Sequence, residues 1–295
     1  MAVLALLAAA VRFGPTTPVG RSLVQRAVNG AKVGALGRLR IEGLTGDPWS
    51  DFSIARVSID DPRGPWLRAR AVRVRWDWRA LLRRQLDIEE IDAAKVTVLR
   101  APTPTPSKAG PRKPPPLSVR LTKLAARLEL EPAFSARYGL YDVAGAFDLA
   151  RSGAVAGKLA AASLTHVGDR LDAAFDLGRA GALNLVLDAH EAKGGAIAGS
   201  LGLPADQPFL VDARARGGAV AGRFVIESRS GALTPLQASG GWTAKGARAE
   251  GRVDLTASRF LAAYRRALGP QARFRLEGVR RAGEIADIAL NAASD

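Results

Sequence analysis

The amino-acid sequence predicts a mainly β fold built from antiparallel strands. From about residue 36 onward, apolar and polar residues alternate, as in the stretch VRVRWDW at residues 72–78. Successive side chains of an extended strand point to opposite faces of a sheet, so this stretch is apolar on one face and charged on the other. Glycine-rich turn signals recur about every ten residues. Long helical patterns do not alternate with these strands, which argues against a parallel α/β fold.

Residues 1–13 begin with the apolar run MAVLALLAAAV, which Arg12 follows. A membrane-spanning helix needs about 20 apolar residues, and a signal peptide carries positive charge before its apolar run. This run is too short for a spanning helix, and Met1 leads directly into it. We therefore interpret residues 1–13 as a clipped membrane anchor or signal segment, with the start lying inside a longer anchor as the favoured alternative.

Residues 14–35 predict a short amphipathic helix next to this segment. Thr17 is a suitable N-cap, Pro18 suits the first helical position, and Asn29-Gly30 ends the pattern. Apolar residues recur at helical spacing between these limits, with basic residues beside them. Such a helix can lie on an anionic membrane surface or cover the end of a sheet. The residues expected to contact the membrane are Arg12, Arg21 and Arg26.

Residues 36–100 predict a first β-region. The apolar parity changes between Ile54 and Val57, which indicates a bulge or bend near Ala55–Arg56. A turn is expected at residues 60–64, a strand at residues 69–78, and a short helical or looped crossing at residues 80–85. The residues expected to line the apolar face of this region are Ile41, Phe52, Ile54, Val72, Val74, Trp76, Val96 and Val98.

Residues 101–116 are rich in proline and predict an exposed linker, because proline is excluded from central strands. Residues 117–131 fit a strand or a short helix. Strands separated by glycine-rich turns are then expected up to the C-terminus, with residues 195–203 among them. One helix, at residues 258–268, interrupts this series and stops at Gly269-Pro270. Residues 117–295 thus form a repetitive β-segment whose sheet looks unfinished at its end.

Composition argues against an enzyme. There is no cysteine, and the two histidines, His166 and His190, have no partner at metal-binding spacing. Nucleophile-elbow, phosphate-loop and dinucleotide-binding motifs are absent from the sequence. We therefore expect no catalytic residue, no metal and no cofactor. The net charge of +15 suggests a polyanion or an anionic membrane nearby, but no nucleic-acid-binding motif accompanies it.

The N-terminal part resembles a known family. The stretches TTPVGRSLVQRAV and GRLRIEGLTG, and the long stretch from IARVSIDDPRGPW to KVTVLRAP, are similar to the N-terminal region of the TamB-type translocation and assembly module, within the AsmA-like superfamily. The likeness covers roughly residues 16–102. It includes a strand turn at residues 43–46, a turn ending at Trp66, the strand through Trp76, and Arg100 with Pro102 after it. Residues 117–295 are similar only in texture.

This resemblance implies an elongated antiparallel β-groove, taco-like or an open β-helix, with an apolar lining. It implies an inner-membrane protein with a single-pass anchor and its bulk in the periplasm of a Gram-negative bacterium. The implied partners are phospholipid acyl chains, the inner membrane and a TamA-like outer-membrane barrel. The implied function is conduction of phospholipids toward the outer membrane and support of outer-membrane protein assembly or autotransporter secretion. Since members of the family are several times longer, we interpret the chain as an N-terminal fragment or a frame-broken copy.

Three other interpretations remain. A structural scaffold would act by strand addition at an open sheet edge, without carrying lipid. A polyanion-binding module would rest on the positive charge alone. An outer-membrane barrel would carry aromatic girdles, whereas tryptophans cluster at positions 49, 66, 76 and 78.

Overall fold

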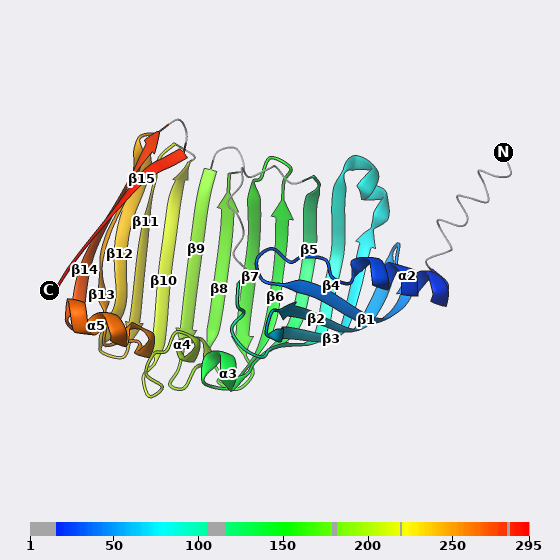
Figure 1. Ribbon diagram of the computed structural model, residues 1–295, viewed down its shortest axis with the longest axis horizontal. Coiled ribbons are helices and arrows are strands. Elements are labelled where there is room, and N and C mark those ends of the chain that lie inside the picture. The colour runs from blue at the N-terminus through cyan, green and yellow to red at the C-terminus, as the bar shows by residue number, and fades with distance from the viewer. Residues whose placement is uncertain (1–15, 105–115, 179–181, 219, 282–283, 295) are drawn as a thin grey trace. The chain divides into compact units, whose positions relative to one another are not determined.

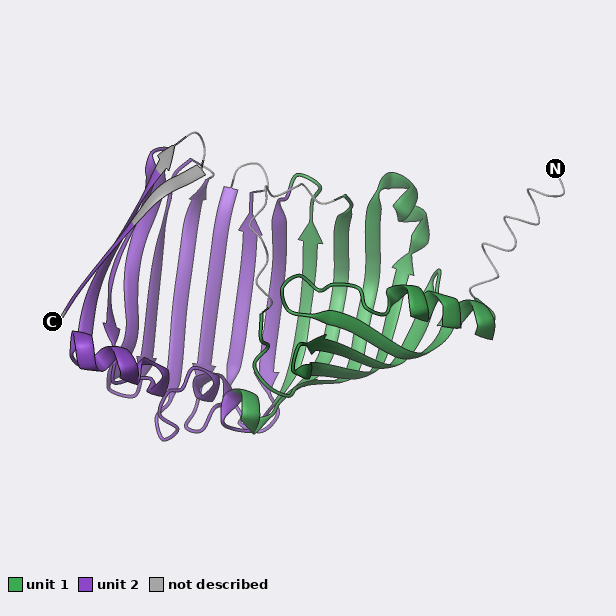
Figure 2. Ribbon diagram, viewed as in Figure 1, with its two compact units in different colours: residues 1–134, 140–152 green, residues 135–139, 153–295 purple. Residues whose placement is uncertain are grey.

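The computed structural model describes residues 16–104, 116–178, 182–218, 220–281 and 284–294. The described residues are mainly β, which confirms the expected fold class. They form 15 strands, and within each compact unit the hydrogen-bonded strand order follows the chain order. Unit 1 comprises residues 1–134 and 140–152, and unit 2 comprises residues 135–139 and 153–295 (Figure 2). The expected anchor at residues 1–13 lies outside the described residues.

Unit 1 begins with helix α2 (Pro18–Val28), which matches the expected helix at both ends. The Thr17 hydroxyl accepts a hydrogen bond from the Gly20 N–H at 3.1 Å, so Thr17 is the N-cap. After the helix, the Asn29 side chain accepts from the Ile41 N–H at 2.6 Å and donates to the Ile41 carbonyl. Residues 30–33 continue this pairing with residues 37–39. The segment therefore covers part of the outer edge of the first strand, which would otherwise present unpaired backbone groups.

Six strands follow in the described part of unit 1. The first four form an antiparallel meander. A 3₁₀ helix, η2 (Trp78–Arg83), joins the third and fourth strands, as expected for the crossing near residues 80–85. Trp78 thus leaves the strand to which the sequence assigned it. The strands are β1 (Arg38–Asp47), β2 (Asp51–Asp61), β3 (Gly64–Asp77), β4 (Gln85–Val98), β5 (Ser118–Leu130) and β6 (Gly139–Leu149).

Strands β4 and β5 are parallel, so the expectation of antiparallel pairing is wrong at this point. Gln85 lies opposite Ser118, and Val98 lies opposite Leu130. Parallel neighbours require the chain to return to the starting end of the first strand. Strand β4 has 14 residues, which is about 46 Å at 3.3 Å per residue. The chain makes this return between Val98 and Ser118, and residues 105–115 of the expected linker lie outside the described residues.

A line of small residues crosses strands β1 to β4. The pairs on either side of it, such as Glu42 with Arg56 and Leu44 with Ile54, keep one register. The same holds between β2 and β3 and between β3 and β4. The residues on this line, which we call the crease, are Gly43, Ala55, Ala71 and Ala94. Gly43 and Ala71 have φ values of 71° and 49°, a region that L-residues rarely occupy.

The crease reverses the alternation of side chains along each strand. Residues three apart, such as Ile41 with Leu44 and Ala69 with Val72, consequently belong to one buried cluster. Ideal alternation would place them on opposite faces. The bend expected near Ala55 is therefore present, but it contains no extra residue. The resemblance suggested a turn at residues 43–46; these residues instead lie inside strand β1, because the positive φ of Gly43 bends the strand without ending it.

A buried ion pair fixes the end of the β2–β3 hairpin. The Asp61 carboxylate is fully buried and accepts hydrogen bonds from the Arg100 guanidinium at 2.6 and 2.8 Å. It also accepts from the N–H groups of Arg63 and Thr103 at 2.7 Å. These interactions, led by the hydrogen bond from Arg100, hold the pKa of Asp61 well below its usual range. They attach the start of the crossover connection to the hairpin.

Unit 2 contains an antiparallel meander with short helices at the ends of its strands (Figure 1). The helices are α4 (Ala196–Ser200), η4 (Arg259–Leu261) and α5 (Ala262–Leu268), and a further short helix, α3 (Pro132–Ser135), precedes β6. The strands are β7 (Val155–Ser163), β8 (Arg170–Leu177), β9 (Ala182–Glu191), β10 (Phe209–Gly218), β11 (Gly222–Ser230), β12 (Leu233–Thr243), β13 (Gly246–Asp254), β14 (Gln271–Arg281) and β15 (Glu284–Ser294).

One expectation for unit 2 is wrong. Residues 195–203 form helix α4 and a turn rather than a strand, because the buried Glu191 carboxylate accepts hydrogen bonds from the N–H groups of Ile197 and Ala198. Strand β12 contains Thr234-Pro235 and Gly240-Gly241, which are typical of turns. Within the described residues this strand has a register shift beside its proline. The expected helix at residues 258–268 is present as η4 and α5.

We predict that Gly43→Ala destabilises the protein through both backbone strain and a steric clash. A Cβ at Gly43 would lie 2.6 Å from the Ala55 Cβ, so the substitution should lower the free energy of unfolding by about 2–4 kcal/mol. Gly64→Ala is the matched control, because Gly64 has a φ of 96° but no atom within 4 Å of the added Cβ. Urea unfolding measures both variants. Adding Ala55→Gly should recover the steric part, and equal losses for Gly43→Ala and Gly64→Ala would contradict a close-packed crease.

We predict that Asp61→Asn reduces the acid sensitivity of the fold. The pKa of Asp61 is lowered in the folded state, so its carboxylate stabilises the fold above the unfolded pKa of about 3.9. This contribution is lost as the pH falls below that value toward the folded-state pKa. The variant should be less stable at pH 7 and should lose less stability on acidification. Urea unfolding at several pH values tests this, with exposed Glu42→Gln as control; parallel pH profiles for wild type and Asp61→Asn would refute it.

Candidate functional site

The register of strands β7 to β15 aligns residues of unit 2 in rows across the sheet, and on one face four of these rows contain no charged side chain. Residues directly opposite each other on neighbouring strands share a face. One row contains Leu159, Ala173, Leu187, Ala213, Ile226, Ala238, Gly251, Phe274 and Ala292. The next contains Gly157, Phe175, Leu185, Ala215, Phe224, Gly240, Ala249, Leu276 and Leu290. The flanking rows through Leu171 and Leu183 are also uncharged. We call this surface the apolar face.

The opposite face of unit 2 is charged. Asp172, Asp188, Asp212 and Glu227 lie in register on four neighbouring strands. Arginines beside this acidic row compensate for its charge, as in the Arg214–Asp212 pair at 2.7 Å and the Arg229–Glu227 pair at 2.7 Å. These pairs are solvent-exposed and add little stability. Their effect is to keep this face hydrated, which fixes the apolar face as the only side of this sheet region suited to an apolar partner.

The apolar face is only partly covered. Leu177 is 38% exposed and Leu290 is 63% exposed. Close covering occurs near one end, where Ala198 of α4, Leu203 and Ala257 pack with Phe209 of β10. Helix α5 has seven residues, about 10 Å of helix. None of the helices in the described part of unit 2 is long enough to cover nine strands, and exposure along the apolar face ranges from buried alanines such as Ala213 and Ala238 to half-buried and exposed leucines.

Glycines keep one region of the apolar face free of side chains. A Cβ added to Gly240 would lie 2.8 Å from the Phe224 ring, and one added to Gly222 would lie 2.0 Å from the Trp242 ring. The two aromatic rings therefore lie against glycine backbone, with Phe224 of β11 beside Gly240 of β12 and Trp242 of β12 beside Gly222 of β11. The Trp242 indole N–H donates to the Gly218 carbonyl at 2.8 Å, which fixes its ring. Both side chains are half-buried, so part of each ring is available for contact with an apolar molecule.

The structure brings together six of the eight residues that the sequence assigned to an apolar lining. Ile41, Ile54 and Val72 belong to one buried cluster in unit 1, and Phe52, Val74 and Val96 pack against it. Val24 and Val28 of helix α2 also pack against this cluster. The crease places these residues on one face. The cluster is therefore a packed core in unit 1, in contrast to the more open face of unit 2.

The other two predicted lining residues have different surroundings. Val98 is buried at the end of β4, outside this cluster. Trp76 is half-buried, and its indole N–H donates to the Pro48 carbonyl at 2.9 Å. Trp66 behaves similarly, donating to the Leu36 carbonyl at 2.8 Å. Both tryptophans thus attach a loop to strand β3.

The structure describes two of the three residues expected to contact the membrane. Arg12 lies outside the described residues. The Arg21 guanidinium donates to the Gly46 carbonyl at 3.4 Å, so Arg21 attaches α2 to strand β1. Arg26 is exposed. On the same helix, Val19 and Leu23 are 71% and 56% exposed, whereas Val24 and Val28 pack on the sheet. Helix α2 therefore has one apolar side on the sheet and another in solvent.

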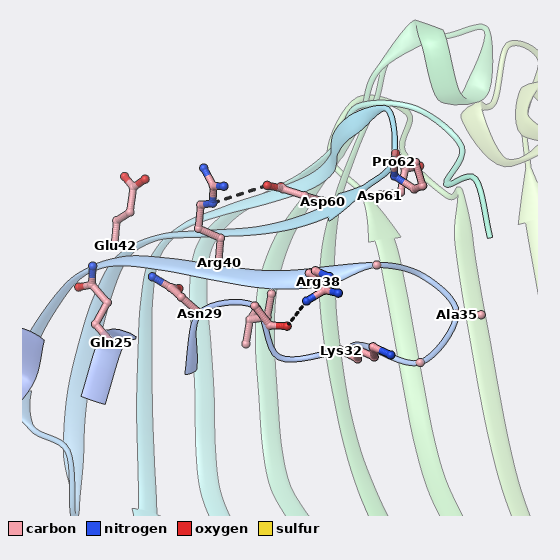
Figure 3. Close-up of a pocket in the computed structure, with 14 residues that line it drawn as sticks. Gln25, Asn29, Lys32, Ala35, Arg38, Arg40, Glu42, Asp60, Asp61 and Pro62 are labelled. Carbon is pink, nitrogen blue, oxygen red and sulfur yellow. Dashed lines mark hydrogen bonds and ion pairs between the residues drawn. The ribbon is translucent and has the colours of Figure 1, made fainter. Parts of the chain in front are cut away.

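A polar hollow of about 1050 Å³ lies beside α2 (Figure 3). Its lining combines cations and anions, and Arg40 forms an ion pair with Asp60 at 3.7 Å. The Arg38 guanidinium donates to the Gly30 carbonyl. This mixture of charges gives the hollow no preference for an anion or a cation. The lining residues are Gln25, Asn29, Gly30, Lys32, Gly34, Ala35, Gly37, Arg38, Leu39, Arg40, Glu42, Asp60, Asp61 and Pro62.

The described residues contain no cluster of three or more histidine, cysteine, aspartate or glutamate side chains arranged to hold a metal ion. Across the same residues, no helix combines the length and apolar character needed to cross a membrane. The lining residues predicted from the sequence lie between residues 41 and 98, and none of them belongs to the apolar face of unit 2. Alternation within each strand indicates its apolar side, but the register of nine strands determines which residues form one continuous face.

Comparisons with protein-family models, with curated proteins and with solved structures gave no match. The geometry described above therefore carries the functional argument. Its central feature is a multistranded sheet with one uncharged, partly exposed face and one charged face.

Proposed function

We propose that the chain binds phospholipid acyl chains on the apolar face of unit 2 and carries them along it. The observation that supports this is the set of four uncharged rows that run across β7 to β14. A large exposed apolar patch on a protein normally marks an interaction surface. Acyl chains are extended, apolar and without hydrogen-bonding groups, so they match a face without charged side chains, on which Ser228 and Trp242 already bond to the backbone.

The energetics of such a face suit transport rather than selective binding. Burial of one methylene contributes about 0.8 kcal/mol, so a long acyl chain is held without a specific pocket. Neighbouring rows offer nearly the same side chains, and a lipid moving between them loses and regains similar contacts. Movement along the face then requires no catalytic residue and no cofactor. A concentration gradient or an external energy source sets its direction.

The resemblance of residues 16–102 to the TamB-type family suggests where in the cell this activity takes place. We propose an inner-membrane-anchored protein, with its bulk in the periplasm of a Gram-negative bacterium, that moves phospholipids toward the outer membrane. A TamA-like barrel is the proposed outer-membrane partner for protein assembly. The groove form of the sheet belongs to this proposal as well. Its support is the match of residues around Gly43, Trp66, Trp76 and Arg100.

A structural scaffold is the second candidate. Strand β15 follows β14 at the end of the strand order, and an edge strand can pair with a strand of another protein. By contrast, residues 29–33 cover part of the edge of β1. A scaffold of this kind would leave the apolar face free of lipid.

We predict that a charge on the apolar face removes bound lipid, whereas the same charge on the opposite face does not. Leu177→Asp places a carboxylate in the acyl-chain path, and a buried unpaired charge is strongly unfavourable. Leu210→Asp is the matched control, because Leu210 lies in register with His190 and Arg229 on the charged face. The two leucines are 38% and 41% exposed. The measurement is phospholipid per chain, by organic extraction and mass spectrometry after expression in a Gram-negative host.

The expected result is phospholipid on the wild type and on Leu210→Asp, with a loss of several-fold on Leu177→Asp. Circular dichroism checks that each variant is folded. A folded wild-type chain without lipid would contradict the proposal and favour the scaffold. Equal lipid content in the two variants would show that lipid does not lie on the apolar face.

A further inference from the structure

The loop that joins β3 and β4 presents an exposed leucine among arginines. In helix η2, Ala80 is fully buried and anchors the loop, whereas Leu82 is 80% exposed. Arg79, Arg83 and Arg84 surround this leucine in sequence and are exposed. Arg84 has a φ of 56°, a conformation that is strained for a residue with a side chain. The fold thus holds an apolar side chain in water where it makes little contact with the protein.

An aromatic pair lies next to this leucine. The rings of Trp49 and Trp78 meet edge to face, with centroids 5.9 Å apart. Trp49 belongs to the β1–β2 turn, and Trp78 begins η2, so the contact joins two loops at one end of unit 1. Both rings are half-buried. Tryptophan is enriched where a protein meets the membrane–water interface, because its ring is apolar and its N–H is polar.

Three aspartates near this end accept hydrogen bonds within the protein, and a fourth, Asp87, lies opposite Asp77. The Asp51 carboxylate accepts hydrogen bonds from the Arg73 guanidinium, which lowers the pKa of Asp51. Asp47 accepts from the Trp49 N–H and the Ser50 hydroxyl. Asp77 accepts from the Arg79 N–H at 2.9 Å. Residues 78–84 themselves contain three arginines and no acid, so the tip of the loop is positively charged.

We propose that the η2 loop, with Leu82 at its tip and the Trp49–Trp78 pair at its base, docks on the surface of an anionic phospholipid bilayer. The leucine enters the interfacial region, the tryptophans lie at headgroup level, and the arginines contact phosphate groups. Charge complementarity selects this occupant over a neutral apolar partner. This proposal rests on the proposed function, because a lipid carrier has to contact the bilayer that supplies its lipid.

Helix α2 is connected to the same end of unit 1. Arg21 donates to the Gly46 carbonyl, one residue before the turn that carries Trp49. The β1–β2 turn region therefore contacts both elements: Arg21 of α2 bonds to Gly46 just before the turn, and Trp78 of η2 packs on Trp49 within it. We infer that α2 and the η2 loop form two parts of the membrane contact, of which the loop is the part that sequence patterns did not indicate.

A single labelled cysteine tests this inference in the full chain. The sequence has no cysteine, so Leu82→Cys carries an environment-sensitive fluorophore at one position. Vesicles of phosphatidylethanolamine and phosphatidylglycerol should shift its emission to the blue, and quenchers attached to the lipids should reduce it. Val167→Cys is the matched control, because Val167 is fully exposed in the β7–β8 turn of unit 2, away from η2 in the sequence. Its label should stay in water.

Replacing arginines by glutamine at positions 79, 83 and 84 should lower the ratio of inserted to free label about fivefold per arginine, since each contributes about 1 kcal/mol near an anionic surface. Added salt should have the same effect. A label at position 82 that stays in water while the chain is bound to vesicles would overturn the inference, as would a chain that does not bind them. Lipid extraction from folded Leu82→Ser separates the two proposals: retained lipid with lost insertion would leave the apolar face as a carrier.

Discussion

The structure of unit 2 depends on the segregation of charge between the two faces of its sheet. A sheet with charges on both faces would have no apolar surface to bury, and one with two apolar faces would need a layer on each side. Here the charged face is hydrated and internally paired, whereas the apolar face has only short helices near one end of its strands. Water contact with this face is a free-energy cost that an apolar occupant would remove. The proposed lipid binding follows from this imbalance.

Unit 1 buries the apolar side of its strands in a different way. The crease rotates the side chains of four strands so that residues three apart face the same core, and Val24 and Val28 of α2 pack against it. Small residues are required along the crease, because a Cβ on Gly43 would overlap that of Ala55. The segment that covers the edge of β1 continues from α2 to Asn29. The Asn29 side-chain amide bonds to the backbone N–H and carbonyl of Ile41, as a neighbouring strand would. Apolar burial and edge protection thus come from one short stretch of chain.

Local signals in the sequence were sufficient for much of this fold. Thr17, Pro18 and Asn29 define α2 because capping is a local interaction, and the strands of both units follow from alternation. Local sequence signals gave the wrong structure where contacts with distant residues determine it. Glu191 converts residues 195–203 into a helix through its contacts with two N–H groups, and no pattern within those residues shows it. The parallel pairing of β4 and β5 likewise depends on where the chain returns after a long connection.

The sequence predicted an apolar lining on strand faces but not which faces are open. It assigned the lining to residues such as Ile41 and Val72, which are buried in a packed cluster. Alternation alone cannot distinguish a covered face from an exposed one, because both have the same period. The distinction depends on whether a helix packs above the strand. Val24 and Val28 do so in unit 1, whereas the rows through Leu177 and Leu276 remain partly open.

The absence of charged side chains from the four rows of the apolar face also limits what it can recognise. A phospholipid headgroup carries charge and hydrogen-bonding groups, and an uncharged face offers no compensation for burying them. The headgroup of a bound lipid therefore has to remain in water at the border of the face while the acyl chains cover it. Discrimination between headgroups would then arise where lipid enters, at a charged surface such as the η2 loop, and not along the path itself.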